Sequence, residues 1–249
     1  MTTDLVPDLN LFDHLYLFAV FVLFPIAATR SYRSWLRAVE AGEAPHRLKA
    51  YAQTMAVQWS ALAVLVLLWF WQARPWSDLG FVAVGGWGFW LGLSAIVVML
   101  VVSLLSWRSL RDADEEQRRS QREALGTLVH FLPHDRRELR GFFAVSCTAG
   151  TVEEVIYRGF AFWYLAAWLP LWAVVIVTAL GFALAHLYQG VGNATRVFGI
   201  GLVFGVLYPL TGSIWLPIFA HALFDILQGL MIYEILRQRD EEPGAAAPA

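Results

Sequence analysis

The residues of this chain that are best able to do chemistry lie within three apolar segments of its second half. They are acids, bases and imidazoles in otherwise hydrophobic runs: Glu153, Glu154, Arg158, His186, His221 and Asp225. A charged side chain at the centre of a bilayer costs about 2.5–3.5 kcal/mol on the insertion scale, so such a residue calls for a function or a partner. We therefore expect any chemistry between residues 139 and 236.

The first of these segments contains two adjacent glutamates and an arginine. On a helix Glu154 and Arg158 are four residues apart and share a face, which predicts an ion pair. Glu153 points about 100° away, so Arg158 cannot serve it equally well. Thr151, three positions before Glu154, would also fit a capping box that opens a helix after Gly150. The pair and the box are compatible, and both leave Glu153 for another role.

The other two segments supply imidazoles. His221 and Asp225 are four residues apart and share a helix face, and Pro217 one turn earlier is expected to kink that helix. His186 ends a separate apolar run. The simpler explanation for His186 is a hydrogen-bonded role in packing. The simpler explanation for His221 and Asp225 is a buried hydrogen bond between helices. Together with the spare glutamate they also fit hydrolysis, since a carboxylate can deprotonate water while imidazoles hold the water and the oxyanion. The spacing alone leaves an enzyme and a proton-coupled transporter equally open.

The elements that must carry these residues are membrane-spanning helices. Hydrophobic residues make up 58% of the 249 residues and charged residues 15%, whereas a soluble domain would have about a quarter charged. A span needs about 20 apolar residues. Seven segments qualify, some of them near the lower length limit: 15–29, 51–71, 81–107, 139–168, 171–187, 196–210 and 213–236. We predict an all-α transmembrane bundle of about seven spans, the last four forming the catalytic core.

Basic residues predict the orientation of this bundle. The stretches 30–50 and 108–140, with Arg196, Arg237 and Arg239, hold 16 of the 18 Lys and Arg residues and fall on one side if seven spans alternate. Positive residues favour the cytoplasmic side, so we expect an outside N-terminus and a cytoplasmic C-terminus in an inner or plasma membrane. A net charge of −2 offers no basic surface for nucleic acid, and a single cysteine excludes an intramolecular disulfide.

Three regions follow from these patterns. Residues 1–130 would form an N-terminal region of three spans that ends in a polar cytoplasmic helical linker. Residues 131–236 would form the core, with a break at Ala149-Gly150-Thr151 because segment 139–168 is too long for one untilted span. Residues 237–249 have little to bury and are predicted to be disordered.

Three motifs occur in order on separate hydrophobic segments: Glu153-Glu154-x-x-x-Arg158, Phe182-x-x-x-His186 and His221-x-x-x-Asp225. This arrangement, over residues 130–232, resembles the CPBP (Abi) family of intramembrane proteases, which includes CAAX prenyl endopeptidases and bacteriocin-processing or immunity proteins. The resemblance implies that Glu153 activates water held by His186, that His221 stabilises the oxyanion, and that Glu154 and Arg158 form a supporting ion pair. The implied substrate is a lipidated or membrane-associated protein or peptide.

One motif position departs from the family pattern. The prenyl-processing branch usually has Asn where this chain has Asp225, and an ionised aspartate would repel an oxyanion. Asp225 would therefore be protonated, orient His221 or serve another purpose, and a prenylated substrate is less firmly implied.

Two alternatives to a metal-free protease stay open. Glu153, His186 and His221 could bind a catalytic zinc ion, although no HExxH spacing is present, and we favour catalysis without a cofactor. A non-catalytic scaffold or immunity-type protein could also retain these residues. Two homologous halves, which would favour a carrier, are not evident.

Overall fold

The computed structural model describes residues 8–237, and this part of the chain is built from helices without strands. One continuous helix opens it, formed by α1 (Leu11–Phe18), the π-helical turn η1 (Ala19–Leu23) and α2 (Phe24–Glu40). Next come α3 (Arg47–Trp71), η2 (Trp76–Leu79), α4 (Gly86–Arg111), α5 (Glu115–Leu125) and η3 (Gly126–His130). The second half comprises α6 (Arg136–Glu154), η4 (Val155–Ala161), α7 (Phe162–Ala166), α8 (Leu171–Ala185), η5 (Leu187–Gln189), α9 (Val191–Thr211) and α10 (Trp215–Arg237).

Five helices of the described chain are long and apolar enough to cross a membrane. They are Leu11–Glu40, Arg47–Trp71, Gly86–Arg111, Val191–Thr211 and Trp215–Leu236. The other two predicted segments also fall on helices but differ in kind. The run α6–η4–α7 carries several charges, and α8 has 15 residues, about 22 Å of helix against a hydrocarbon core of about 30 Å. The all-helical membrane class is thus confirmed with five candidate spans rather than seven.

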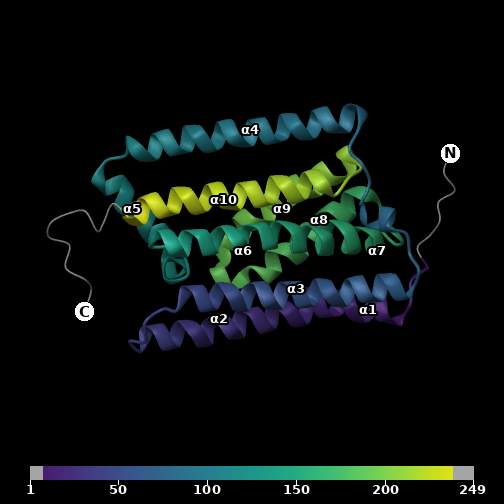
Figure 1. Ribbon diagram of the computed structural model, residues 1–249, viewed down its shortest axis with the longest axis horizontal. Helices are drawn as coiled ribbons and strands as arrows, with labels where there is room; N and C mark the ends of the chain where they lie inside the picture. Colours follow the sequence, from purple (N-terminus) through teal and green to yellow (C-terminus); the bar gives the residue numbers. More distant parts are fainter. Residues whose placement is uncertain (1–7, 238–249) are drawn as a thin grey trace.

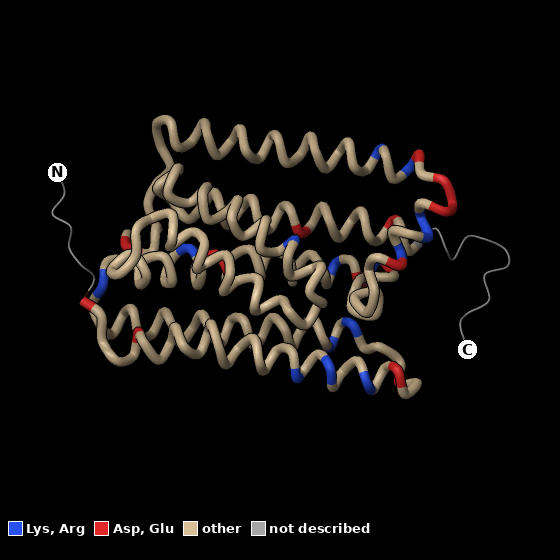
Figure 2. Tube along the Cα trace, turned by 180° about the vertical axis from the view of Figure 1, so that it is seen from behind, with Lys and Arg blue, Asp and Glu red and all other residues tan. Residues whose placement is uncertain are grey.

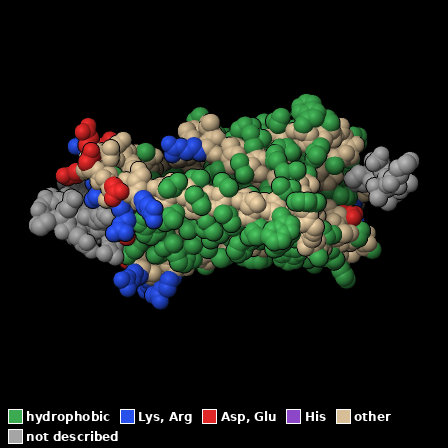
Figure 3. Space-filling view, turned by 90° about the horizontal axis from the view of Figure 1, so that it is seen from above, with side chains coloured by type: hydrophobic (Ala, Val, Ile, Leu, Met, Phe, Trp, Pro, Cys, Tyr) green, Lys and Arg blue, Asp and Glu red, His purple; other side chains and the backbone are tan. Residues whose placement is uncertain are grey.

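The outer surface of the bundle has the character of a lipid-facing one. Large apolar side chains such as Leu67, Phe70, Trp87 and Val98 are more than half exposed, and apolar groups cover most of the face in Figure 3. Lysines and arginines gather mainly at one end of the bundle (Figure 2). A soluble monomer rarely leaves so large an apolar surface in water.

Helix α6 lies at the centre of the bundle. It packs between α3 on one side and α10 on the other, while α8 and α9 pair behind them and α4 lies against α9 and α10 (Figure 1). The polar stretch before α6 forms the short helix α5, whose N-cap is Asp114 and which buries no side chain. That finding agrees with the predicted solvated helical linker.

At the end of the bundle where α3 ends, an ion pair connects the first helix to the loop between α3 and η2. The Arg74 guanidinium donates to both carboxylate oxygens of Asp13 at 2.7 Å and to the Asp8 carbonyl at 2.6 Å. It also lies over the rings of Trp69 and Trp163. Asp13 is buried, so this contact fixes the position of the first helix next to α3.

The predicted break at Ala149-Gly150-Thr151 is wrong, because α6 runs without interruption from Arg136 to Glu154. The irregularity comes directly afterwards, as the π-helix η4. Thr151 is not a cap either, since its hydroxyl donates to the Cys147 carbonyl one turn back at 2.8 Å. Pro217 produces no mid-helix kink, because α10 begins at Trp215 and the first turn of a helix tolerates proline. The predicted disordered tail lies outside the described residues except for Arg237.

Gly150 is glycine because α6 and α10 approach closely there. A Cβ atom at Gly150 would lie 2.6 Å from the backbone nitrogen of Ala222 and 2.8 Å from its Cα, and neither backbone atom can move aside locally. Ala222 follows His221, and Gly150 precedes the two glutamates by one helical turn. The missing side chain therefore lets the acids of α6 reach the imidazole of α10.

Replacing Gly150 with alanine should destabilise the protein by about 1–3 kcal/mol, the usual effect of overpacking. Gly199→Ala is the matched control, because a Cβ atom at Gly199 within α9 would have nothing within 4 Å and alanine favours helix. Thermal unfolding in detergent, followed by the fraction of monodisperse protein, measures both. Equal midpoints for the two variants would contradict the close approach.

Candidate active site

The most deeply buried part of the site is an ion pair. Arg158 Nη1 donates to Glu154 Oε1 at 2.8 Å, and both side chains are 0% exposed, which confirms the predicted pair. Arg158 Nη2 also donates to the Gly201 carbonyl on α9 at 2.9 Å. The guanidinium lies 4.8 Å from the ring centroid of Phe182 and 5.7 Å from that of Phe204. Arg158 thus joins η4 to α8 and α9.

The same oxygen of Glu154 has a second partner that the spacing did not predict. His221 Nδ1 lies 2.7 Å from Glu154 Oε1. An ionised carboxylate only accepts hydrogen bonds, so Nδ1 carries the proton and Nε2 is the nitrogen that faces the rest of the site. The Phe204 ring stacks on the His221 imidazole at 5.1 Å and fixes its plane.

Glu153 and Asp225 lie on the Nε2 side of His221. Glu153 Oε2 is 3.9 Å from this nitrogen and Asp225 Oδ2 is 3.6 Å from it, so neither distance is that of a direct hydrogen bond. The side chains of Glu153 and Asp225 are 15% and 31% exposed, against 5% for His221. Exposure therefore rises from the ion pair outward, and Glu153 and Asp225 are the acids that an incoming molecule can reach.

Glu153 has a partner from the first half of the chain. Gln58 Nε2 on α3 donates to Glu153 Oε1 at 2.7 Å. The sequence contained a signal for this residue, because Gln58 is an amide within the mostly apolar run of α3. We missed it by considering only ionisable groups within the spans.

His186 is connected to the site through the ring of Phe182. His186 Nδ1 bonds to the Phe182 carbonyl at 2.8 Å, which again assigns the proton to Nδ1 and leaves Nε2 free to accept. The Phe182 ring is 4.7 Å from the imidazole of His186 and 5.8 Å from that of His221. Among the described residues, no hydrogen bond or ion pair links His186 to Glu153, His221 or Asp225. The structure thus brings five of the six predicted residues into one connected cluster and sets His186 beside it.

Tyr188, just beyond the α8 helix, stacks on His186 with ring centroids 6.1 Å apart. Burial raises the pKa of Tyr188 to about 12, so its hydroxyl keeps its proton at neutral pH. The Gln189 amide donates to that hydroxyl at 3.1 Å. Tyr188 therefore contributes a neutral wall beside His186 rather than a second base.

A zinc ion would need Glu153, His186 and His221 to converge. Within residues 8–237 no three His, Cys, Asp or Glu side chains are grouped as metal ligands would be. Both histidines have Nδ1 bonded and Nε2 free, and Glu153 Oε1 is held by Gln58. The three side chains are therefore not gathered around one point as the ligands of a bound metal ion would be.

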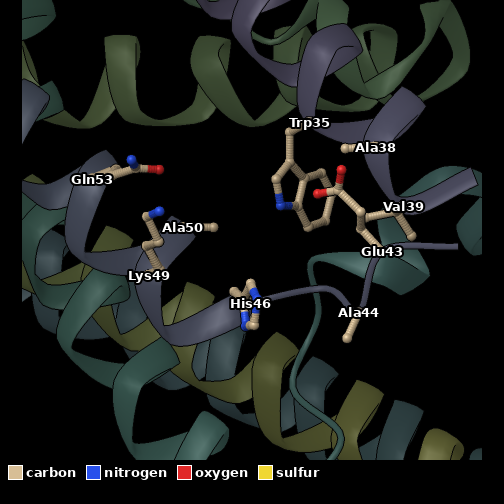
Figure 4. Close-up of a pocket in the computed structure, with 9 residues that line it drawn as sticks. All are labelled: Trp35, Ala38, Val39, Glu43, Ala44, His46, Lys49, Ala50 and Gln53. Atoms are coloured by element: carbon tan, nitrogen blue, oxygen red, sulfur yellow. The ribbon is translucent and has the colours of Figure 1, made fainter. Parts of the chain in front are cut away.

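One hollow of the described surface lies away from these residues. It has a volume of about 160 Å³ and lies where α2 and α3 are joined, among Trp35, Glu43, His46, Lys49 and Gln53 (Figure 4). None of the six predicted site residues lines it. The candidate site is therefore distinguished by its side-chain chemistry and not by this hollow.

Comparison with known families agrees with the position of the site. The family model described as "Type II CAAX prenyl endopeptidase Rce1-like" matches residues 136–227, which include α6, η4, α8, α9 and the first half of α10. No curated protein and no solved structure matches the chain. All three motifs fall within the matched residues. The match of residues 136–227 to this family model agrees with the resemblance that the three motifs predicted.

Proposed function

We propose that this protein is an intramembrane endopeptidase that hydrolyses a peptide bond with water activated by Glu153. One observation carries the proposal. Glu154 accepts hydrogen bonds from Arg158 and His221. Glu153 accepts one only from a neutral amide, and its Oε2 faces His221 Nε2 at 3.9 Å. A carboxylate that is partly exposed and has no direct cationic hydrogen-bond donor is suited to accept a proton.

In the proposed reaction Glu153 Oε2 takes a proton from water, and the resulting hydroxide attacks the scissile carbonyl carbon. His186 Nε2 accepts the other hydrogen of that water and so orients it. His221 donates from Nε2 to the oxyanion, which requires a ring protonated on both nitrogens while Nδ1 stays bonded to Glu154. Glu153 then returns its proton to the leaving nitrogen as the C–N bond breaks.

Asp225 fits an orienting role better than direct contact with the oxyanion. Its Oδ2 lies 3.6 Å from His221 Nε2, and the two residues share a face of α10. A carboxylate at this distance favours the doubly protonated ring that donation requires, by simple attraction of opposite charges. Within this proposal Glu154 and Arg158 hold His221 and take no part in proton transfer.

The proposed unit of function spans residues 131–236, with residues 1–130 as an N-terminal region of three spans. We infer that α6–η4–α7 and the short α8 cross or enter the membrane together with the five long helices, which gives seven. The basic end would face the cytoplasm of a cell with the protein in its inner or plasma membrane. The substrate would be a lipidated or membrane-anchored protein, in keeping with the name of the family.

A non-catalytic scaffold or immunity-type protein is the second candidate. It is favoured by the burial of Glu154, Arg158 and His221, since a buried polar network can serve helix association alone. It leaves the partly exposed Glu153 without a purpose, and for that reason we rank it second.

Glu153→Gln should abolish cleavage with little change in folding, because the amide keeps the volume but cannot accept the proton. We expect a loss of about 10²–10⁴-fold in kcat. Purified protein in liposomes would be given lipidated and membrane-anchored peptides, and cleavage sites would be read by mass spectrometry. Wild type with a strong chelator runs alongside. Full activity of the variant would refute Glu153 as the base, and loss with chelator that added metal restores would assign the site to a metalloprotease.

Glu154→Ala should instead lower stability, because it strands Arg158 and removes the acceptor of His221. Breaking a buried pair costs about 3–5 kcal/mol. Glu123→Ala is the matched control, since Glu123 also pairs with an arginine four residues away, Arg119, but both side chains are at least 66% exposed. Unfolding midpoints and folded yield in detergent distinguish the two. A Glu154→Ala protein as stable as the control would rule out a supporting role.

The orientation can be tested with cysteine labelling in a Cys147→Ser background. Asp78→Cys in η2 should react with an impermeant maleimide in intact cells, and Ser120→Cys in α5 should react only after the membrane is opened. Both positions are exposed in the structure, so lack of reaction reports membrane sidedness. The reverse pattern would invert the proposed topology.

A further inference from the structure

We propose that Gln58 of α3 is a positioning residue for Glu153, so that the active site includes a helix outside the family-matched residues 136–227. The inference rests on the proposed function, in which Glu153 is the base. It concerns a residue that belongs to none of the three motifs.

The contact is directional. Gln58 Nε2 lies 2.7 Å from Glu153 Oε1, and Gln58 is only 7% exposed. An ionised carboxylate has no hydrogen to give, so the NH₂ side of the amide must face it. That orientation leaves Gln58 Oε1 buried without any hydrogen-bond partner in the described residues.

The backbone around Gln58 is held in place against α6. Trp59 Nε1 donates to Thr148 Oγ1 at 3.2 Å. Thr148 lies on α6 between Gly141 and Glu153. Further along, Gly141 makes room for Tyr51, because a Cβ there would lie 3.0 Å from the tyrosine ring. The Tyr51 hydroxyl donates to the Phe131 carbonyl at 2.7 Å. Helix α3 therefore presents Gln58 to Glu153 as part of a fixed interface.

This geometry has a consequence for catalysis. With Oε1 held by the amide, the remaining oxygen of Glu153 is the one that points to His221 Nε2. In the proposed reaction both hydrogens of the catalytic water go to Glu153 and His186, so Gln58 acts on the base through its nitrogen alone. Gln58 keeps this orientation although its Oε1 is left as a buried acceptor without a partner, which is costly.

A purely structural role of Gln58 would predict a different result. An amide within a membrane helix needs a hydrogen-bond partner in any case, and helix association alone would explain the contact. In that case replacement of Gln58 would change the stability and leave kcat of the folded fraction intact. A positioning role changes kcat and leaves KM unchanged, because the substrate does not bind to Gln58.

The test uses full-length protein in liposomes with Gln58→Met, which keeps the length of the side chain without the hydrogen bonds. We expect kcat, corrected for the folded fraction, to fall about 10- to 100-fold with KM unchanged, as for loss of a hydrogen bond to a charged group. Gln53→Met is the matched control, since Gln53 lies on the same helix but is exposed, and it should retain kcat. An unchanged kcat for Gln58→Met in an active enzyme would overturn the inference.

A second measurement does not depend on activity. The thermal midpoints of Gln58→Met, Glu153→Ala and the double variant form a double-mutant cycle, with Gln53→Met and Glu153→Ala as the parallel control cycle. Coupling is expected in the first cycle and additivity in the second. If the wild type cleaves no peptide, the proposed function fails, and the cycle still decides the contact. Additive effects of Gln58→Met and Glu153→Ala would reject the role of Gln58 in either case.

Discussion

One oxygen atom, Glu154 Oε1, holds the site together. It accepts hydrogen bonds from Arg158 on η4 and from His221 on α10, and Arg158 extends the connection to the Gly201 carbonyl on α9. Because Glu154 is fully buried, removal of Arg158 would leave its charge without compensation in a medium of low polarity, and removal of His221 would leave its oxygen short of a hydrogen bond. The orientation of His221, the approach of α10 to α6 and the freedom of Glu153 all follow from this shared acceptor.

Local spacing was sufficient to predict much of the site. The Glu154–Arg158 pair depends only on the four-residue repeat of a helix, and the membrane class depends on composition and on long apolar runs. Each of these features depends on residues within a single helix, so it can be read directly from the sequence. The motif order predicted the match to the family model for the same reason, because it depends on residue types along the chain and needs no knowledge of how helices cross.

Contacts between helices could not be predicted in this way. The bond from His221 to Glu154 and the bond from Gln58 to Glu153 depend on crossing angles and on where α6 touches its neighbours. Gly150 looked like a helix breaker, yet its lack of a side chain serves the contact with Ala222 instead. The π-helix η4 likewise has no signature that we could read from periodicity. Helix α6 is not among the five candidate spans, because it carries the charged residues of the candidate site.

The local nature of the Glu154–Arg158 pair also matters for how the protein is made. Synthesis proceeds from the N-terminus, so if α6 and η4 enter the membrane, as we propose, they do so before α9 and α10 exist. At that stage Glu154 lacks His221, and Arg158 lacks the Gly201 carbonyl, but the two already lie on one helix and neutralise each other. An arginine on α9 could give the same final arrangement, yet α6 would then have to wait in the bilayer with an uncompensated acid. The spacing that supports the finished site therefore also makes its central helix acceptable to the insertion machinery.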